Sequence, residues 1–187
     1  QMNETLKVIR ERRSIRDFRE EQIKEEELQA ILEAGIYAPS ARNGQPWHFT
    51  VIQNKGLIDR LNRDFKELAR NSDHAYAKRA ANIKGYHVFH NAPTVIILSG
   101  DEDNHYSIVD CAAAVQNILL AAESLGIGTC WVGFIAYLLN NPDYRGYYEE
   151  LGIPKGYKQY HSIALGYKKT LETEAPERKS GVINYIR

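Results

Sequence analysis

Hydrophobic residues recur along this chain at two spacings, helical in some segments and continuous in others. One stripe joins Ile58, Leu61 and Phe65, and a similar stripe falls within residues 24–35. Recurrence at three and four residues is typical of helices with one buried face. This pattern predicts helices over residues 5–11, 24–35, 57–70, 107–125 and 142–151, and less distinctly over 73–90.

Short apolar runs predict the strands. Residues 94–98 are apolar on both faces, which is typical of a central strand, and residues 129–134 are a second candidate of that kind. Further strands are predicted over 47–53 and 161–167. These strands do not alternate regularly with helices, so the pattern favours an α+β fold over a doubly wound sheet. Neither repeats nor linkers divide the chain, so residues 1–187 are predicted to form a single domain.

Charge and composition exclude several classes of partner. The chain has 187 residues, with 24 Lys and Arg against 24 Asp and Glu. A net charge of zero argues against nucleic acid or an anionic membrane as partner. The most apolar stretch, residues 108–125, is interrupted by polar residues and does not read as a membrane span. Two cysteines make no disulfide framework, and residues 1–13 do not resemble a signal peptide, so a cytoplasmic location is expected.

The first candidate site is a basic cluster that follows the first predicted helix: Arg12, Arg13, Ser14 and Arg16. Guanidinium groups bind phosphate oxygens in a bidentate manner and keep their charge when partly buried. Alternate residues of an extended segment face the same way, so Arg12, Ser14 and Arg16 would share one side. The cluster therefore predicts a phosphate site. The alternative is a solvated basic turn, balanced by nearby acidic residues.

The second candidate is the loop that leads into the first strand, residues 39–49. Ser40, Asn43 and Gln45 offer donors and acceptors of the kind that the edge of a pyrimidine-like ring requires. Two prolines stiffen the loop, and Gly44 permits unusual backbone angles. An ordinary structured turn is the alternative interpretation.

Glycines mark a third candidate, residues 126–134, where a glycine-rich strand would let main-chain N–H groups approach a ligand closely. Arg178 and Lys179 could reach back to an anion, or could be ordinary surface residues. His87 and His90 lack a matching third ligand, so no metal site is expected. The phosphate-binding turns of Rossmann and P-loop proteins are absent from the sequence.

These motifs, taken in order, resemble the FMN-dependent nitroreductase family across nearly the full chain. The resemblance rests on Arg-Arg-Ser-x-Arg and on Ala-Pro-Ser-x-x-Asn-x-Gln-Pro-Trp-His-Phe. It extends through the helix at residues 110–126, Gly-Ile-Gly-Thr-Cys-Trp-Val-Gly, and Ala-Leu-Gly-Tyr at 164–167. It implies a nitroreductase-like α+β fold, with a central, mostly antiparallel sheet of four to five strands flanked by helices. It also implies an intertwined homodimer with two FMN sites at the subunit interface.

The resemblance assigns roles residue by residue. Arg12, Arg13, Ser14 and Arg16 would hold the phosphate, the ribityl chain and the pyrimidine edge. The other subunit would contribute Pro39, Ser40, Ala41, Asn43 and Gln45. Val132 and Gly133 would present backbone N–H groups near flavin N5, and Arg178 would close on the phosphate. Asn82 and Lys84 are the only guesses for further contacts to the pyrimidine.

The implied activity is hydride transfer from NADH or NADPH through flavin N5 to a small electron-poor acceptor, such as a nitroaromatic, quinone or enone, by a ping-pong cycle. Because a flavin itself carries this chemistry, no side chain is nominated as catalytic. Two alternatives remain. One is a flavin-storage or flavin-sensing protein, and the other is a dehalogenase or flavin-fragmenting member of the same superfamily.

Overall fold

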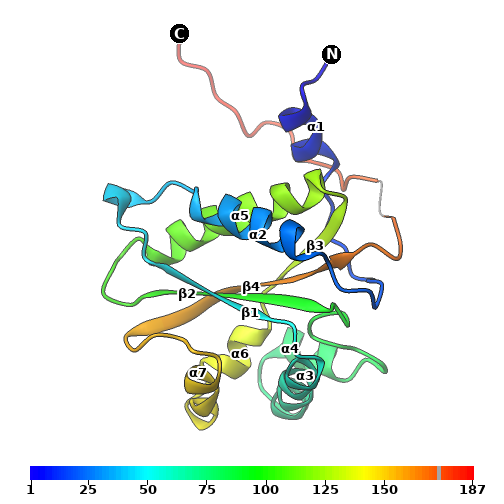
Figure 1. Ribbon diagram of the computed structural model, residues 1–187, viewed down its shortest axis with the longest axis vertical. Coiled ribbons are helices and arrows are strands. Elements are labelled where there is room, and N and C mark those ends of the chain that lie inside the picture. The colour runs from blue at the N-terminus through cyan, green and yellow to red at the C-terminus, as the bar shows by residue number, and fades with distance from the viewer. Residues whose placement is uncertain (172–173) are drawn as a thin grey trace.

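Four antiparallel strands form the sheet of this computed structural model, which describes residues 1–171 and 174–187. Their order across the sheet is β1–β2–β4–β3 (Figure 1). The strands are β1 (Trp47–Ile52), β2 (Thr94–Asp101), β3 (Ile127–Val132) and β4 (Tyr157–Tyr167). The predicted α+β class and antiparallel sheet are confirmed.

Helices account for most of the remaining regular structure. The α-helices are α1 (Glu4–Glu11), α2 (Glu25–Ile36), α3 (Lys55–Arg70), α4 (Ala75–Ala81), α5 (Ser107–Ser124), α6 (Ile135–Leu139) and α7 (Gly146–Glu150). Two short 3₁₀ turns are η1 (Ala41–Asn43) and η2 (Pro142–Tyr144). Asparagine is the N-cap residue of both α1 and α3. The side chain of Asn3 accepts a hydrogen bond from Leu6 N, and that of Asn54 accepts one from Leu57 N.

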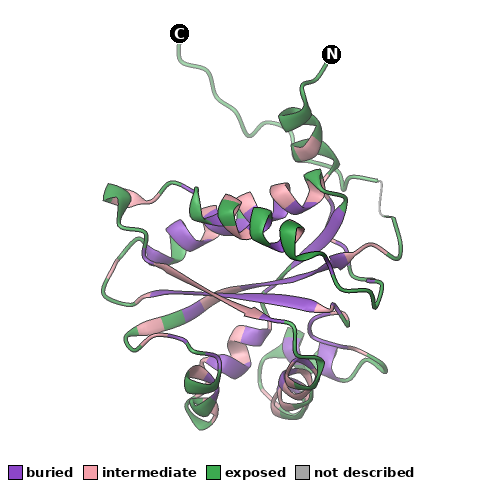
Figure 2. Ribbon diagram, viewed as in Figure 1, coloured by how far each residue is buried: buried purple, intermediate pink, exposed green. Residues whose placement is uncertain are grey.

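The sheet separates two hydrophobic layers. α2 and α5 cover one face, and α3, α4, α6 and α7 lie on the other (Figure 1). Successive residues of β2 point alternately into the two layers, so Val95 and Ile97 join one core while Ile96 and Leu98 join the other. This is why residues 94–98 carry no polar face. Burial is concentrated in β2, β3 and much of β4 and on the helix faces that cover them, whereas β1 is mostly half-buried (Figure 2).

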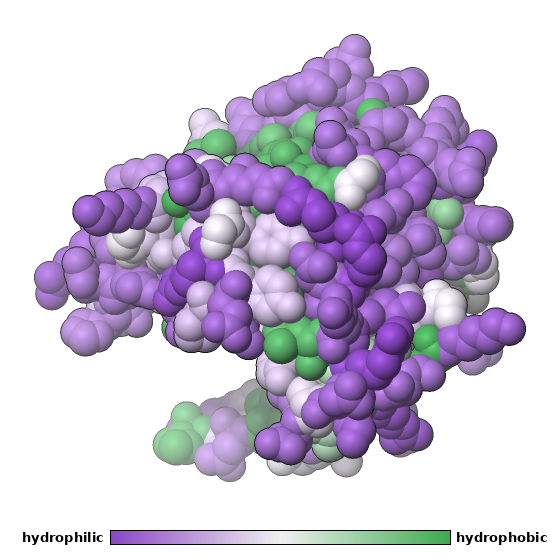
Figure 3. Space-filling model, turned by 90° about the horizontal axis from the view of Figure 1, so that it is seen from below, coloured by the Kyte–Doolittle hydropathy of each residue, from purple (hydrophilic) through white to green (hydrophobic). Residues whose placement is uncertain are grey.

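The face formed by α3, α6 and α7 is largely hydrophilic, with few hydrophobic side chains scattered across it (Figure 3). Within the described residues, no helix combines the length and the apolar character that a membrane crossing requires.

Several element predictions need correction. The helix predicted over 73–90 is confined to α4, because the Asn82 side chain donates to the Lys78 carbonyl at the helix end and Gly85 turns the chain at a φ of 78°. The helix predicted over 142–151 is split into η2 and α7, and α6 was not predicted. β3 lies at the edge of the sheet rather than at its centre. Its run is apolar because its side chains enter both layers, Cys130 and Val132 one core and Ile127 the other. Ser14 forms a parallel bridge with Thr129 along its free edge.

Candidate functional site

The basic segment after α1 lies along the edge of β3. Ile15 N donates to the Thr129 carbonyl at 2.8 Å, which holds this segment extended. Arg13 and Ile15 are buried, while Arg12, Ser14 and Arg16 lie on the more exposed side. The alternation expected of an extended segment is therefore present, and it separates one buried guanidinium from two accessible ones.

A cavity of 360 Å³ opens over this segment. Arg12, Ser14 and Arg16 line it together with Arg178, which approaches from the C-terminal tail. The structure thus brings together cationic side chains that are more than 160 residues apart in the sequence. Glu174 also lines the cavity.

Arg13 is held differently from its neighbours. Its guanidinium donates to the carbonyls of Arg12 and Arg10, at 2.5 and 2.9 Å, and so occupies acceptors at the C-terminal end of α1. A cation is stabilised at this end of a helix. The buried Nε of Arg13 has no hydrogen-bond partner among the described residues. Most of this guanidinium therefore fixes the helix end, and one donor remains available beside the cavity.

Arg16 also borders a second cavity, of 350 Å³. Its walls are largely apolar and include the aromatic side chains of Tyr86 and Phe134. The backbone of Val132 and Gly133 lies along the same cavity, where β3 ends. A Cβ on Gly133 would meet nothing within 4 Å, so the main chain is openly accessible there. The second cavity suits a flat, largely apolar group.

The loop from Pro39 to Gln45 is remote from both cavities within one chain. It lies at one end of the layer formed by α2 and α5, whereas α1 and the tail lie at the other end (Figure 1). Neither cavity includes any residue of this loop. A single chain therefore brings Arg12, Arg13, Ser14, Arg16, Val132, Gly133 and Arg178 into one region and leaves Pro39, Ser40, Ala41, Asn43 and Gln45 outside it.

Local hydrogen bonds give this loop a defined shape. Ala41 N donates to the carboxylate of Asp110 at 3.2 Å, and Gln45 N donates to Ser40 Oγ at 3.0 Å. Arg42, Asn43 and Gln45 have φ values of 55°, 53° and 45°, a costly conformation for residues with a side chain. Gly44 does not supply the unusual angles that its flexibility predicts, because its φ is −67°. A Cβ there would lie 3.2 Å from the Ala41 carbonyl, so compactness explains the glycine.

Comparison with known proteins identifies the family of this chain. The model of the nitroreductase family matches residues 9–167. The chain belongs to the nitroreductase family. A crystal structure of a nitroreductase from Bacteroides fragilis with bound FMN is similar, with a TM-score of 0.91 and 36% identity over 100% of both chains.

Two further relatives agree. An FMN-bound nitroreductase from Desulfitobacterium hafniense has a TM-score of 0.90 and 34% identity, again over 100% of both chains. A curated relative from Archaeoglobus fulgidus, whose name includes NAD(P)H nitroreductase, is 34% identical over 172 residues. That match covers 90% of this chain and 87% of the relative. The nitroreductase resemblance and the corresponding fold are therefore confirmed.

Residues between α4 and β2 contribute to the second cavity, but not Asn82 and Lys84, which were suggested from the sequence. Asn82 Nδ2 donates to the carbonyls of Arg70 and Lys78, so its amide closes the end of α4. Lys84 is exposed and does not line the cavity. Tyr86 and His90 line it instead. The only sequence signal for this part of the site was that the segment around Tyr86 and His90 is rich in aromatic and titratable residues.

Buried histidines predict a loss of stability in acid. Burial lowers the pKa of His87, His161 and His90, in the last case to about 4 with a contribution from nearby Arg16. Below their ordinary pKa of about 6.5, these groups bind more protons when the chain is unfolded. The free energy of unfolding should therefore be highest above about pH 6.5 and fall as the pH decreases toward about 4.

Urea denaturation at a series of pH values between about 7.5 and 4.5 measures this slope. His90→Gln should make the slope shallower, because glutamine takes up no proton. A midpoint that stays constant or rises over this range would contradict the prediction.

Proposed function

We propose that this chain is an FMN-dependent oxidoreductase, which transfers hydride equivalents from NADH or NADPH to a small electron-poor acceptor. Nitroaromatics, quinones and enones are the candidate acceptors. The observation that carries the proposal is the meeting of two cavities at Arg16, one cationic and one aromatic. This arrangement matches a cofactor with an anionic phosphate at one end and a flat ring at the other.

The residues of the cationic cavity fit a phosphate. Arg12, Arg16 and Arg178 supply guanidinium forks, and Ser14 supplies a hydroxyl. The free Nε of buried Arg13 is a further donor with no partner among the described residues. Charge-assisted bidentate bonds of this kind are stronger than bonds between neutral groups. Binding a phosphate would also offset the mutual repulsion of these cations.

The second cavity fits the ring. Aromatic walls would contact its apolar part and exclude water, while Arg16 would place a positive charge beside its polar edge. The accessible main chain at Val132 and Gly133 would bring backbone N–H groups to the ring. A fixed donor and a fixed cation favour negative charge that develops on a bound group. Flavin, when bound, supplies the hydride chemistry, so the chain needs only to bind and orient it.

The remaining predicted contacts require a second copy. Exposed apolar residues support a homodimer. α1 has no buried residue, and its Leu6 and Ile9 are about half exposed. The tail carries four further exposed apolar residues, Val182, Ile183, Tyr185 and Ile186. Apolar surface of this extent is typical of an interface. In the proposed dimer, the loop from Pro39 to Gln45 of one copy would complete the site of the other.

Anaerobic titration of the purified protein tests the proposed function. Added FMN should bind tightly and give a yellow complex, and NADH or NADPH should bleach it rapidly. A nitroaromatic or quinone should then restore the colour. A flavin complex that neither nucleotide reduces would favour flavin storage or sensing instead. Protein that binds no FMN would contradict the proposal altogether.

A further inference from the structure

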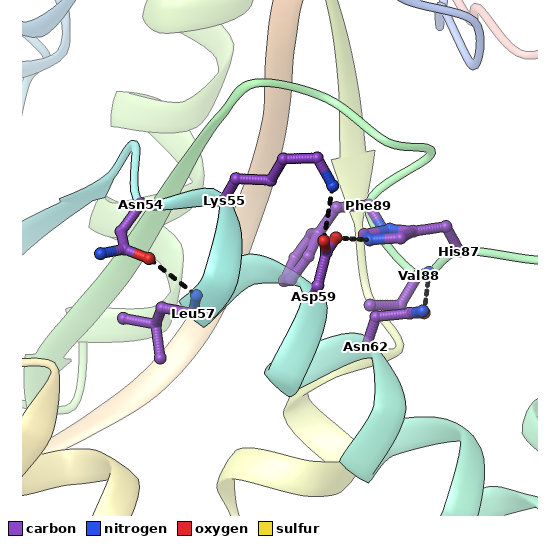
Figure 4. Close-up of polar contacts among 8 residues, drawn as sticks. All are labelled: Asn54, Lys55, Leu57, Asp59, Asn62, His87, Val88 and Phe89. Atoms are coloured by element: carbon purple, nitrogen blue, oxygen red, sulfur yellow. Dashed lines mark hydrogen bonds and ion pairs between the residues drawn. The ribbon is translucent and has the colours of Figure 1, made fainter.

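Two hydrogen-bonded anchors hold the segment between α4 and β2 against α3 (Figure 4). Val88 N donates to Asn62 Oδ1 at 2.8 Å, and His87 Nε2 lies 3.2 Å from Asp59 Oδ1. Val88 and the adjacent Phe89 are fully buried. The next residue, His90, is therefore attached to a rigid support where it borders the aromatic cavity.

Hydrogen bonding determines the tautomer of His87. Its Nδ1 accepts from Phe89 N at 3.0 Å, so the proton is on Nε2, which donates to Asp59 (Figure 4). Both ring nitrogens are thereby occupied. Protonating Nδ1 would break the bond to Phe89 N, and burial lowers the pKa of His87 as well. The neutral ring thus acts as a fixed link between α3 and the segment that carries His90.

The backbone at His90 is in a conformation that few residues adopt. His90 and Asn91 have φ values of 55° and 58°, in the left-handed region. Two consecutive non-glycine residues there cost free energy, which the surrounding structure must offset. The anchors at Asn62 and Asp59 supply that support. Such conformations are concentrated at binding sites, where they direct a side chain that a regular backbone would turn elsewhere.

The imidazole of His90 has no hydrogen-bond partner within the part of the chain that the structure describes, although the ring is partly buried. It contacts Tyr86 edge to face, with ring centroids 6.2 Å apart. Burial, Arg16 and His87 lower its pKa to about 4, so it is neutral near pH 7. A neutral imidazole has one donor and one acceptor. Arg16, by contrast, offers donors only, so the two side chains present complementary groups to one cavity.

We propose that His90 contacts the flavin directly and hydrogen-bonds the polar edge of its ring beside Arg16. The Asp59–His87 pair is then a positioning device that holds His90 in place. This inference rests on the proposed function, because it assumes that FMN occupies the aromatic cavity. It names a contact residue that lies outside the family motifs found in the sequence.

Nitrogen NMR of the histidine rings tests the contact in the unaltered protein. Adding FMN near pH 7 should shift the ring ¹⁵N resonances of His90, because one of its nitrogens acquires a hydrogen-bond partner on the flavin. The ring of His48, which lies against Tyr157 and lines neither cavity, should not shift. This measurement needs no substitution at the site, so it does not depend on whether a variant folds.

Binding measurements test the contribution to affinity. His90→Phe should raise the dissociation constant of FMN roughly two- to tenfold, the usual range for one hydrogen bond. His90→Gln, which keeps a donor and an acceptor, should recover most of that loss. Asp59→Ala should weaken FMN binding through His87, whereas the matched control His48→Gln should leave it unchanged.

The outcomes separate this inference from the proposed function. If the unaltered protein binds FMN but its His90 resonances stay in place and His90→Phe binds FMN equally well, the contact is wrong and the proposed function stands. If the unaltered protein binds no FMN, both are wrong. A shifted His90 resonance together with recovery by His90→Gln supports the contact.

Discussion

Replacing Arg12 with alanine is expected to raise the dissociation constant of FMN roughly ten- to a hundredfold, because hydrogen bonds to charged groups contribute about 1.5–3 kcal/mol. The affinity for riboflavin, which lacks the phosphate, should change little. Arg12 lines only the cationic cavity, and the aromatic cavity would remain intact. Fluorescence titration with the two flavins measures the difference. Adding Arg178→Ala should increase the loss for FMN.

Arg19→Ala is the matched control for this prediction. Arg19 is a nearby surface residue, 59% exposed, that pairs with Glu21 and lines neither cavity. The Arg19→Ala variant should bind both flavins as the unaltered protein does. Equal losses for FMN and riboflavin in Arg12→Ala would indicate damage to the fold. Full FMN affinity in that variant would exclude this cavity as the phosphate site.

Mixed dimers provide the second large effect. In the proposed dimer, each site combines the arginines of one copy with the loop of the other. Pairing an Arg12→Ala copy with an Asn43→Ala, Gln45→Ala copy would place both defects in one site and leave the other intact. Each variant alone should bind FMN weakly, whereas the mixed dimer should regain one site of full affinity. Differently tagged copies, co-purified and titrated with FMN, give the stoichiometry.

The reverse arrangement is the control for the mixed dimers. When all three substitutions are placed in one copy and the partner is unaltered, both shared sites are damaged, so no site of full affinity should remain. A site contained within one chain would give the opposite results, with one intact site in this control and none in the first pairing. That reversal would overturn the shared site.

Local patterns explain how much of the fold could be predicted. The stripe of Ile58, Leu61 and Phe65 needs only helical periodicity to be recognised, and the run at 94–98 needs only burial on both faces. The segment at 73–90 was predicted less well. Val88 and Phe89 lie in a loop but are apolar because their side chains belong to the hydrophobic core. In the sequence, such buried loop residues look like the buried face of a helix. α6 has five residues, which is too short for periodicity to show.

The candidate site, like the fold, could be predicted from the sequence only in part. The sequence alone determined the residue types and their order: the basic cluster at Arg12–Arg16, the polar loop at 39–45 and the glycines around β3. Their chemistry is local, and their order indicated the family. Only the tertiary structure decided that Arg178 shares a cavity with Arg12, that His90 borders the aromatic cavity, and that the polar loop lies away from both. These facts depend on contacts between residues far apart in the chain, which no local pattern encodes.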